Sequence, residues 1–174
     1  MFAKLTRRAF FASTGAVAAL CASGAKARVA PGENSTYVYE ITRTEAEWLD
    51  MLSDEEFVIM REGYTEAPKS SPLWEESRPG SYQCKGCELK AFDGRWKTVL
   101  SKGWVFFLQS EPDAVLMNID GPTPDYGSMA AGQNAVTEVH CRRCGSHLGH
   151  LLIVEGKMRH CINGASLTFA PGQA

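Results

Sequence analysis

The chain has 174 residues, with 18 basic and 20 acidic side chains and a formal net charge of −2 at pH 7. It is long enough for one domain with its own apolar core. No basic stripe occurs along the sequence, which argues against a nucleic-acid partner.

The first 27 residues have the features of an export signal. Lys4 and the adjacent Arg7 and Arg8 precede an apolar stretch rich in Ala and Gly, and Ala25-Lys26-Ala27 is a small-x-small cleavage site. Paired arginines before two aromatic residues are typical of a bacterial twin-arginine signal. We therefore expect the twin-arginine export machinery as a partner, cleavage near Ala27 and a periplasmic protein. A plain Sec signal and a retained signal anchor are the alternatives.

Removal of this leader changes the charge and bears on the cysteines. Its four basic residues leave 14 basic against 20 acidic side chains, a net charge of −6. Because twin-arginine export carries folded proteins, thiols can bind a metal in the reducing cytosol before they meet an oxidising compartment. We divide the chain into a signal peptide (1–27), a loose N-terminal lead-in segment (28–43) and one domain (44–170).

Short helices are predicted at the start of that domain. Thr44 and Glu47 fit a capping box for a helix that carries Trp48 on one face, and residues 53–56 repeat the signal. Residues 64–79 are polar, contain three prolines and are predicted as loop.

Strands follow in the second part of the domain. Runs of β-branched or aromatic residues predict strands at 104–108, 114–119, 135–140, 151–154 and 158–162. Residues 121–134 form a long connection rich in Gly and Pro, of the kind that often borders a site. The expected fold is mainly β with a short helical N-terminal part.

Four cysteines form two Cys-x-x-Cys pairs. Cys84 and Cys87 make the first pair, Cys141 and Cys144 make the second, and glycines accompany both. Each pair places two thiolates on a tight turn, and two such turns complete the tetrahedron that zinc prefers. We predict one structural zinc per chain, or iron in the same cage, because four thiolates leave no open position for catalysis. Two disulfides, or a redox-active pair of the thioredoxin type, are the alternatives.

Cys161 is the remaining cysteine of the mature chain, since Cys21 lies in the leader. It stands in the sequence Arg-His-Cys-Ile-Asn, where positive neighbours favour a thiolate. In a strand, Arg159, Cys161 and Asn163 share a face, so Arg159 is the candidate for activating the thiol and Asn163 for orienting a polar group. A buried structural cysteine is the alternative.

Two histidines directly follow the second cysteine pair. His147 and His150 stand in the sequence Gly-Ser-His-Leu-Gly-His, which we place in one short turn held by the metal site. Two imidazoles near a thiolate suit proton delivery near neutral pH. Ordinary polar loop residues are the alternative. Trp104 is either a core residue or the wall of an apolar pocket.

Motifs in a fixed order carry a resemblance to a known family. They are Trp48, Leu52, Arg61 and Thr65-Glu66; Tyr82, Cys84, Cys87 and Phe92-Asp93; Gly103-Trp104; Thr137-Glu138-Val139, Cys141, Cys144 and His147-Leu148-Gly149-His150; and Arg159-His160-Cys161-Ile162-Asn163 with Ala165-Ser166-Leu167 and Phe169. Together they resemble the methionine-R-sulfoxide reductase B family, also called the SelR domain. The resemblance spans about residues 44–169.

This resemblance implies a fold of two antiparallel sheets with the zinc site away from the chemistry. It implies that Cys161 attacks the sulfur of a peptide-bound methionine-R-sulfoxide and becomes a sulfenic acid. The implied roles are protonation of the leaving oxygen by His147, His150 and Asn163, support of the thiolate by Arg159, and packing of Trp104 on the substrate methyl group. The protein would be a monomeric enzyme that repairs oxidised proteins and peptides.

The chain departs from the family pattern at four places. Val105-Phe106-Phe107 replace Pro-Ser-Phe, and His160 replaces a tyrosine. The stretch after the last histidine of the motif is shortened to residues 151–156, where only Glu155 offers an acidic group. Lys102 stands where many members have a resolving cysteine. We therefore expect an external thiol, from a thioredoxin-like protein, to reduce the sulfenic acid.

Two other functions are compatible with the same motifs. One is a zinc-stabilised β module that binds an oxidised or small polar ligand without turnover. The other is different thiol chemistry on this fold, such as glutathione-dependent work on a small electrophile.

Overall fold

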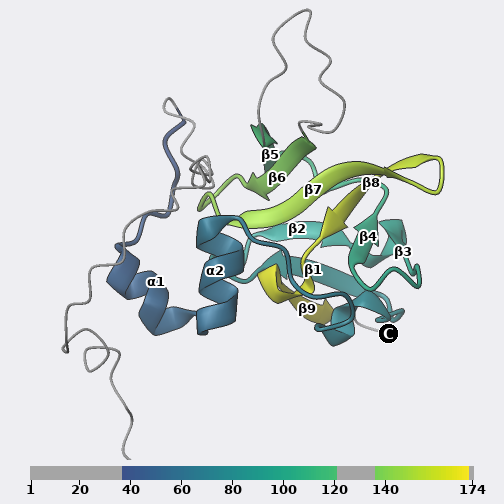
Figure 1. The fold of residues 1–174 in the computed structure, drawn as a ribbon, viewed down its shortest axis with the longest axis horizontal. Coiled ribbons are helices and arrows are strands. Elements are labelled where there is room, and N and C mark those ends of the chain that lie inside the picture. Colours follow the sequence, from purple (N-terminus) through teal and green to yellow (C-terminus); the bar gives the residue numbers. More distant parts are fainter. Residues whose placement is uncertain (1–36, 121–135, 173–174) are drawn as a thin grey trace, which may run out of the picture.

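The computed structural model describes residues 37–120 and 136–172. Two helices come first, and the strands that follow form two antiparallel sheets (Figure 1). None of the helices in the described segments has the length and apolar character needed to span a bilayer. The predicted leader (1–27) and the predicted connection (121–134) lie outside the described residues.

Both helices begin at the predicted capping boxes. In α1 (Glu45–Met51) the Thr44 side chain accepts from the Glu47 N–H, and the Glu47 carboxylate accepts from the Thr44 N–H. The same exchange starts α2 (Asp54–Glu62), between Ser53 and Glu56. Each box satisfies two amides that the helix cannot pair, which stabilises a helix end by about 1 kcal/mol.

The strands build a small sheet and a large one. The small sheet has the order β2 (Lys90–Asp93), β1 (Gly80–Cys84), β9 (Leu167–Pro171). The large sheet has the order β3 (Lys97–Thr98), β4 (Val105–Phe107), β8 (Lys157–Ile162), β7 (His147–Val154), β6 (Val136–Cys141), β5 (Val115–Asp120). In the described residues, single turns of 3-10 helix lie between α2 and β1 (η2, Pro72–Trp74), between β2 and β3 (η3, Gly94–Trp96) and between β8 and β9 (η4, Gly164–Ser166).

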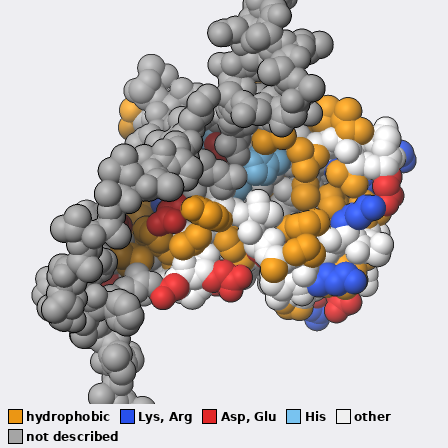
Figure 2. Space-filling model, viewed as in Figure 1, with side chains coloured by type: hydrophobic (Ala, Val, Ile, Leu, Met, Phe, Trp, Pro, Cys, Tyr) orange, Lys and Arg blue, Asp and Glu red, His pale blue; other side chains and the backbone are white. Residues whose placement is uncertain are grey.

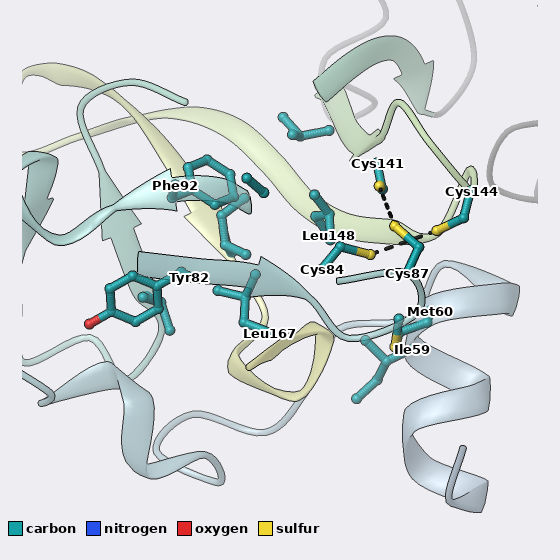
Figure 3. Close-up of a cluster of buried hydrophobic side chains, with 14 of the residues drawn as sticks. Ile59, Met60, Tyr82, Cys84, Cys87, Phe92, Cys141, Cys144, Leu148 and Leu167 are labelled. Atoms are coloured by element: carbon teal, nitrogen blue, oxygen red, sulfur yellow. Dashed lines mark hydrogen bonds between the residues drawn. The ribbon is translucent and has the colours of Figure 1, made fainter. Parts of the chain in front are cut away.

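The core lies where the small sheet meets the middle of the large one. Phe92 of β2 stacks on Phe107 of β4 with ring centroids 4.4 Å apart, and Tyr82 of β1 contacts the same Phe107 at 5.0 Å. Ile59 and Met60 of α2 extend this cluster toward the paired cysteines (Figure 3). The cysteine pairs are therefore part of the core rather than of a surface loop.

The structure confirms the mainly β fold and corrects several strand assignments. The five predicted strands are present, but β7 begins at His147, four residues before the predicted start at residue 151. Strands β1, β2, β3 and β9 were not predicted, because their sequences mix polar and aromatic residues without clear alternation. The domain boundaries at residues 27 and 43 stay predictions.

Candidate active site and metal centre

The four paired cysteines lie together as predicted. Their sulfur atoms are all within 4.8 Å of one another, every one is buried, and they face each other beside α2 (Figure 3). Cys84 Sγ lies 3.7 Å from Cys144 Sγ, and Cys87 Sγ lies 3.4 Å from Cys141 Sγ. Zinc bound to four sulfurs at about 2.3 Å requires sulfur–sulfur distances of about 3.8 Å, so the cluster fits a tetrahedral metal ion.

The alternative of two disulfides is wrong for this structure. All four cysteines are free thiols, and a disulfide needs sulfurs about 2.05 Å apart. The thiols share protons unevenly, because hydrogen bonding with Cys141 and the other neighbours raises the pKa of Cys84 and lowers that of Cys144. With all four deprotonated, thiolates at this separation would repel one another, so a divalent cation is the natural counter-charge for the deprotonated cluster.

The two cysteine turns have matching backbone geometry. The Glu88 N–H donates to the Cys84 carbonyl at 2.7 Å, and the Gly145 N–H donates to the Cys141 carbonyl at 2.9 Å. The donor residue is left-handed in both turns, with φ of 61° at Glu88 and 70° at Gly145. Gly145 adopts this conformation freely, whereas a side chain such as that of Glu88 is strained there.

Arginines hold the outer surface of the cluster. Arg61 donates to the Cys144 carbonyl at 3.3 Å and to Ser146 Oγ at 3.2 Å, while Arg43 donates to the Gly86 carbonyl at 2.9 Å. Both guanidinium groups lie over the ring of Trp48, at 4.5 and 4.8 Å from the ring centroid. The first helix is thereby fastened to both cysteine turns.

Cys161 lies apart from this cluster, in the middle of the large sheet. It stands on β8 directly opposite His150 of β7 and Phe106 of β4. Side chains that are directly opposite in an antiparallel pair share a face of the sheet, so the thiol lies between an imidazole and a phenyl ring. Phe106 is 1% exposed and therefore shields one side of the thiol from water.

A cavity of about 230 Å³ opens onto Cys161. Its lining is mostly apolar and consists of Thr65, Trp104, Gly149, His150, Leu152, Cys161 and Asn163. Figure 2 shows histidine surface in a hollow of this face of the molecule, with apolar side chains around it. The cavity is smaller than the roughly 300–1,000 Å³ of pockets for drug-sized ligands, and it suits a single side chain.

Gly149 allows β7 to approach β8 closely at Cys161. A Cβ at this position would overlap the Cys161 carbonyl oxygen and lie 2.9 Å from the Ile162 Cα. Only glycine permits this approach, so the backbone of Cys161 is held against β7.

A bulge in β7 aligns the two histidines. On β6, Glu138 is opposite His150 and His140 is opposite His147. The two β6 residues are two positions apart, whereas the two histidines of β7 are three positions apart. Strand β7 therefore contains one extra residue, at Leu148. Three residues apart in a regular strand, His147 and His150 would point to opposite faces. The extra residue returns them to one face, where their ring centroids are 5.1 Å apart. The prediction of a short turn here is wrong, since both histidines lie in a strand.

Glu66 connects the other cavity residues. Its backbone N–H donates to Asn163 Oδ1 at 3.1 Å, and its carbonyl accepts from Trp104 Nε1 at 3.3 Å. Its carboxylate accepts from the N–H groups of Gly164 and Ala165 at 2.6 and 2.9 Å. Burial raises the pKa of this carboxyl group, and these two backbone donors act against the shift.

The environment of Cys161 favours the neutral thiol. Burial, and second the charge of Glu66, raise its pKa to about 11. Arg159 is 5% exposed and donates to the Val154 carbonyl at 3.3 Å. The proposed support of the thiolate by Arg159 therefore stays a prediction.

The structure thus brings Cys161, His150, Asn163 and Trp104 to one cavity and places His147 behind His150. It adds Glu66, Glu138 and Phe106, for which the sequence alone suggested no specific role. Glu138 had a detectable signal, because it is an acidic residue inside a β-branched run that predicts a buried strand. Glu66 had none, because it lies in a polar loop.

A cluster of four thiols that could hold a metal ion, and one thiol in an apolar cavity, are features expected of a thiol-dependent enzyme on a β fold. The sequence profile of the SelR domain matches residues 52–171. The chain therefore belongs to the SelR domain family.

Curated relatives cover most of the domain. A peptide methionine sulfoxide reductase MsrB of Agrobacterium fabrum is 32% identical over 137 residues, which is 76% of this chain and 94% of the relative. An MsrB of Herminiimonas arsenicoxydans is 37% identical over 75% of this chain and 91% of its own length. Peptide methionine sulfoxide reductase B5 of Arabidopsis thaliana is 32% identical over 77% and 92%.

Proposed function

We propose that the protein is an exported peptide methionine-R-sulfoxide reductase that repairs oxidised proteins. The observation that carries this proposal is the position of Cys161, a free thiol in an apolar cavity beside His150, Asn163 and Trp104. The cavity accepts one apolar side chain with a small polar end, and a methionine sulfoxide has this shape. The names of the relatives agree with this substrate.

The reaction consumes the Cys161 thiol and one sulfoxide. The thiolate attacks the sulfoxide sulfur while the oxygen takes two protons and leaves as water, which breaks the S–O bond and forms an S–S bond. Water then attacks Cys161 Sγ, methionine leaves with the electron pair of the S–S bond, and one proton is released. The net change oxidises Cys161 to a sulfenic acid and reduces the sulfoxide to the thioether.

The residues around Cys161 supply protons and orientation. His150 would protonate the leaving oxygen, because it is opposite Cys161 and lines the cavity, with His147 behind it. Asn163 Oδ1 accepts from the Glu66 N–H at 3.1 Å and Asn163 Nδ2 donates to the Tyr64 carbonyl at 3.5 Å, so the second N–H of this amide would hold the oxygen. The Trp104 ring is fixed through Nε1 and forms the apolar wall for the substrate methyl group.

The four-cysteine cluster would hold one structural zinc ion. Bound there, zinc would fasten the two cysteine turns to each other, and it would take no part in the chemistry because the cage has no open position.

Reduction of the sulfenic acid requires a second thiol. The other described cysteines are committed to the buried cluster, and Lys102 stands where a resolving cysteine would be. We propose a thioredoxin-like protein as the external reductant, and the leader supports a periplasmic site of action for a monomeric enzyme.

A test compares the two epimers of a peptide methionine sulfoxide. The mature protein with dithiothreitol should reduce the R epimer and leave the S epimer unchanged, and Cys161→Ser should abolish turnover. After one turnover without reductant, mass spectrometry should find oxygen on Cys161 and no intramolecular disulfide. An intramolecular disulfide of Cys161 would contradict the external reductant.

One observation favours a second candidate function. The raised pKa of Cys161 keeps the thiol neutral near pH 7, as expected for a module that binds methionine sulfoxide without turnover. Tight binding of the R epimer by folded, zinc-loaded protein that shows no reduction would establish this candidate.

A further inference from the structure

The carboxylate of Glu138 is buried behind the Cys161 cavity. The residue is 6% exposed, and its ion-pair partners within residues 37–120 and 136–172 are two histidine rings. Glu138 Oε1 lies 2.8 Å from His147 Nδ1, while Oε2 lies 3.7 Å from His140 Nδ1. Since the second distance is too long for a hydrogen bond, His147 is the principal partner.

This contact connects Glu138 to the nucleophile through consecutive strands. Glu138 on β6 is opposite His150 on β7, and His150 is opposite Cys161 on β8. The bulge at Leu148 brings His147 onto the same face, next to His150. The carboxylate, the two imidazoles and the thiol therefore follow one another across three adjacent strands.

The short contact fixes where His147 carries its proton. A carboxylate only accepts hydrogen bonds, so with Glu138 as a carboxylate the 2.8 Å contact assigns the donor proton to Nδ1 of His147. Nε2 is then left to exchange protons, and it has no hydrogen-bond partner among the described residues. A ring that is 1% exposed cannot turn freely to present the other nitrogen.

We infer that Glu138 is a positioning residue for the reduction step: it holds His147 in the Nδ1–H form, so that Nε2 supports proton transfer from His150 to the leaving oxygen. This inference rests on the proposed function and deepens it. Glu138 touches neither the cavity nor Cys161, so it acts through His147. Its charge also stabilises the imidazolium that forms when His147 takes a proton.

The experiment pairs kinetics with NMR on Glu138→Gln, which keeps the size of the side chain and removes its charge. We expect kcat to fall about 10–100-fold, as for other groups that orient a functional histidine, with KM within about threefold of the original value. Glu138→Asp, which retains a carboxylate, should recover part of the lost kcat. Glu111→Gln is the matched control, because this glutamate pairs with Lys90 and neither residue lines the cavity, so kcat of this variant should not change.

Histidine-labelled protein gives the spectroscopic readout. Nitrogen-15 spectra of the wild-type protein should show a proton on His147 Nδ1, and Glu138→Gln should raise the fraction with the proton on Nε2. A merely structural role would change the thermal midpoint or the zinc content without this change of tautomer.

Two results would overturn the inference. One is a kcat for folded, zinc-loaded Glu138→Gln within twofold of the wild type, and the other is an unprotonated Nδ1 on His147 in the wild type. Absence of turnover in the wild-type protein is a different failure, which overturns the proposed function. Wild-type turnover with an unaffected Glu138→Gln variant overturns only the role of Glu138.

Discussion

The cysteine cluster lies directly before β7 and the Cys161 cavity lies beside that strand, yet the two sites place sulfur in opposite surroundings. At the cluster, two turns of matching geometry bury four sulfurs within 4.8 Å of one another. At the cavity, one sulfur lies between Phe106 and His150 and is partly exposed. Only two residues separate Cys144 from His147, so the turn of the cluster fixes where the face of β7 that carries His147 and His150 begins.

This difference shows how one residue type serves two purposes. Sulfurs that surround a common centre satisfy a metal ion and leave it no open position. A single sulfur with polar neighbours on one side and an apolar wall on the other has no such partner and remains available to a substrate. Changes at the two places should therefore separate loss of fold from loss of activity.

The largest expected effect is the difference in zinc content and stability between the Cys84→Ser and Cys161→Ser variants. Cys84→Ser removes one metal ligand from a buried cage, and structural zinc sites contribute about 10–16 kcal/mol of binding free energy. We expect loss of zinc and of cooperative unfolding, measured by elemental analysis and by thermal melting followed with circular dichroism. Cys161→Ser should retain one zinc per chain and the wild-type melting temperature while it loses turnover. Equal loss of zinc in both variants would contradict the separation.

Gly149→Ala should damage the cavity while the cluster survives. The added Cβ would overlap the Cys161 carbonyl oxygen, so β7 and β8 must separate locally. We expect destabilisation by at least about 2 kcal/mol and loss of most activity, with zinc still bound. Urea unfolding and elemental analysis measure the two effects. Gly156→Ala is the control in the same hairpin, because a Cβ there meets nothing within 4 Å, although its left-handed φ of 72° adds a small strain.

Phe106→Ser should activate the thiol at a cost in stability. Below a pKa of about 11, the rate of Cys161 alkylation by iodoacetamide should rise about tenfold per pH unit, because only the thiolate reacts. Removal of the phenyl ring admits water, so the alkylation profile should shift to lower pH. Loss of a buried ring costs about 3–5 kcal/mol, which melting curves measure. An unchanged alkylation profile in the folded variant would show that Phe106 does not set the thiol pKa.

The contribution of Cys161 to stability should decrease as pH rises into the alkaline range. Since the folded-state pKa lies above the ordinary thiol value, the unfolded chain loses its proton first as pH rises. The contribution of Cys161 is fully present below the unfolded pKa and is lost as pH rises toward about 11. Comparison of wild type with Cys161→Ser by urea unfolding between neutral and alkaline pH isolates this contribution.

The smallest effect concerns the two cysteine turns. Glu88 is left-handed at the position where the second turn has Gly145, so Glu88→Gly should stabilise the protein by about 0.5–1 kcal/mol. Gly145→Ala should destabilise it, both through its backbone conformation and because a Cβ would lie 3.0 Å from the Tyr39 ring. Urea midpoints compare the two changes. Destabilisation by Glu88→Gly would mean that the Glu88 side chain makes a contact that outweighs the strain.

The sequence by itself determined the features that depend on local spacing. Both capping boxes begin their helices because an N-cap and its partner are only three residues apart, and each Cys-x-x-Cys pair is one local turn. The grouping of the two pairs into one cluster followed from the chemistry of the thiols, since four soft ligands favour one metal ion. Cys161 was expected to lie apart from the cluster because it is the one cysteine after the predicted leader that belongs to neither Cys-x-x-Cys pair.

Only the tertiary structure decided how the histidines, Glu138 and Glu66 act. The bulge at Leu148 brings His147 and His150 onto one face, whereas simple alternation would place them on opposite faces. A bulge depends on the register with β6 rather than on β7 alone. Glu66 reaches Gly164 across 98 positions of sequence. The raised pKa of Cys161 likewise comes from burial against other strands, so flanking residues such as Arg159 do not reveal it. Contacts between segments that are distant in sequence depend on how the sheets pack and on the register of their strands. The residues next to a position in the sequence therefore do not predict its contacts.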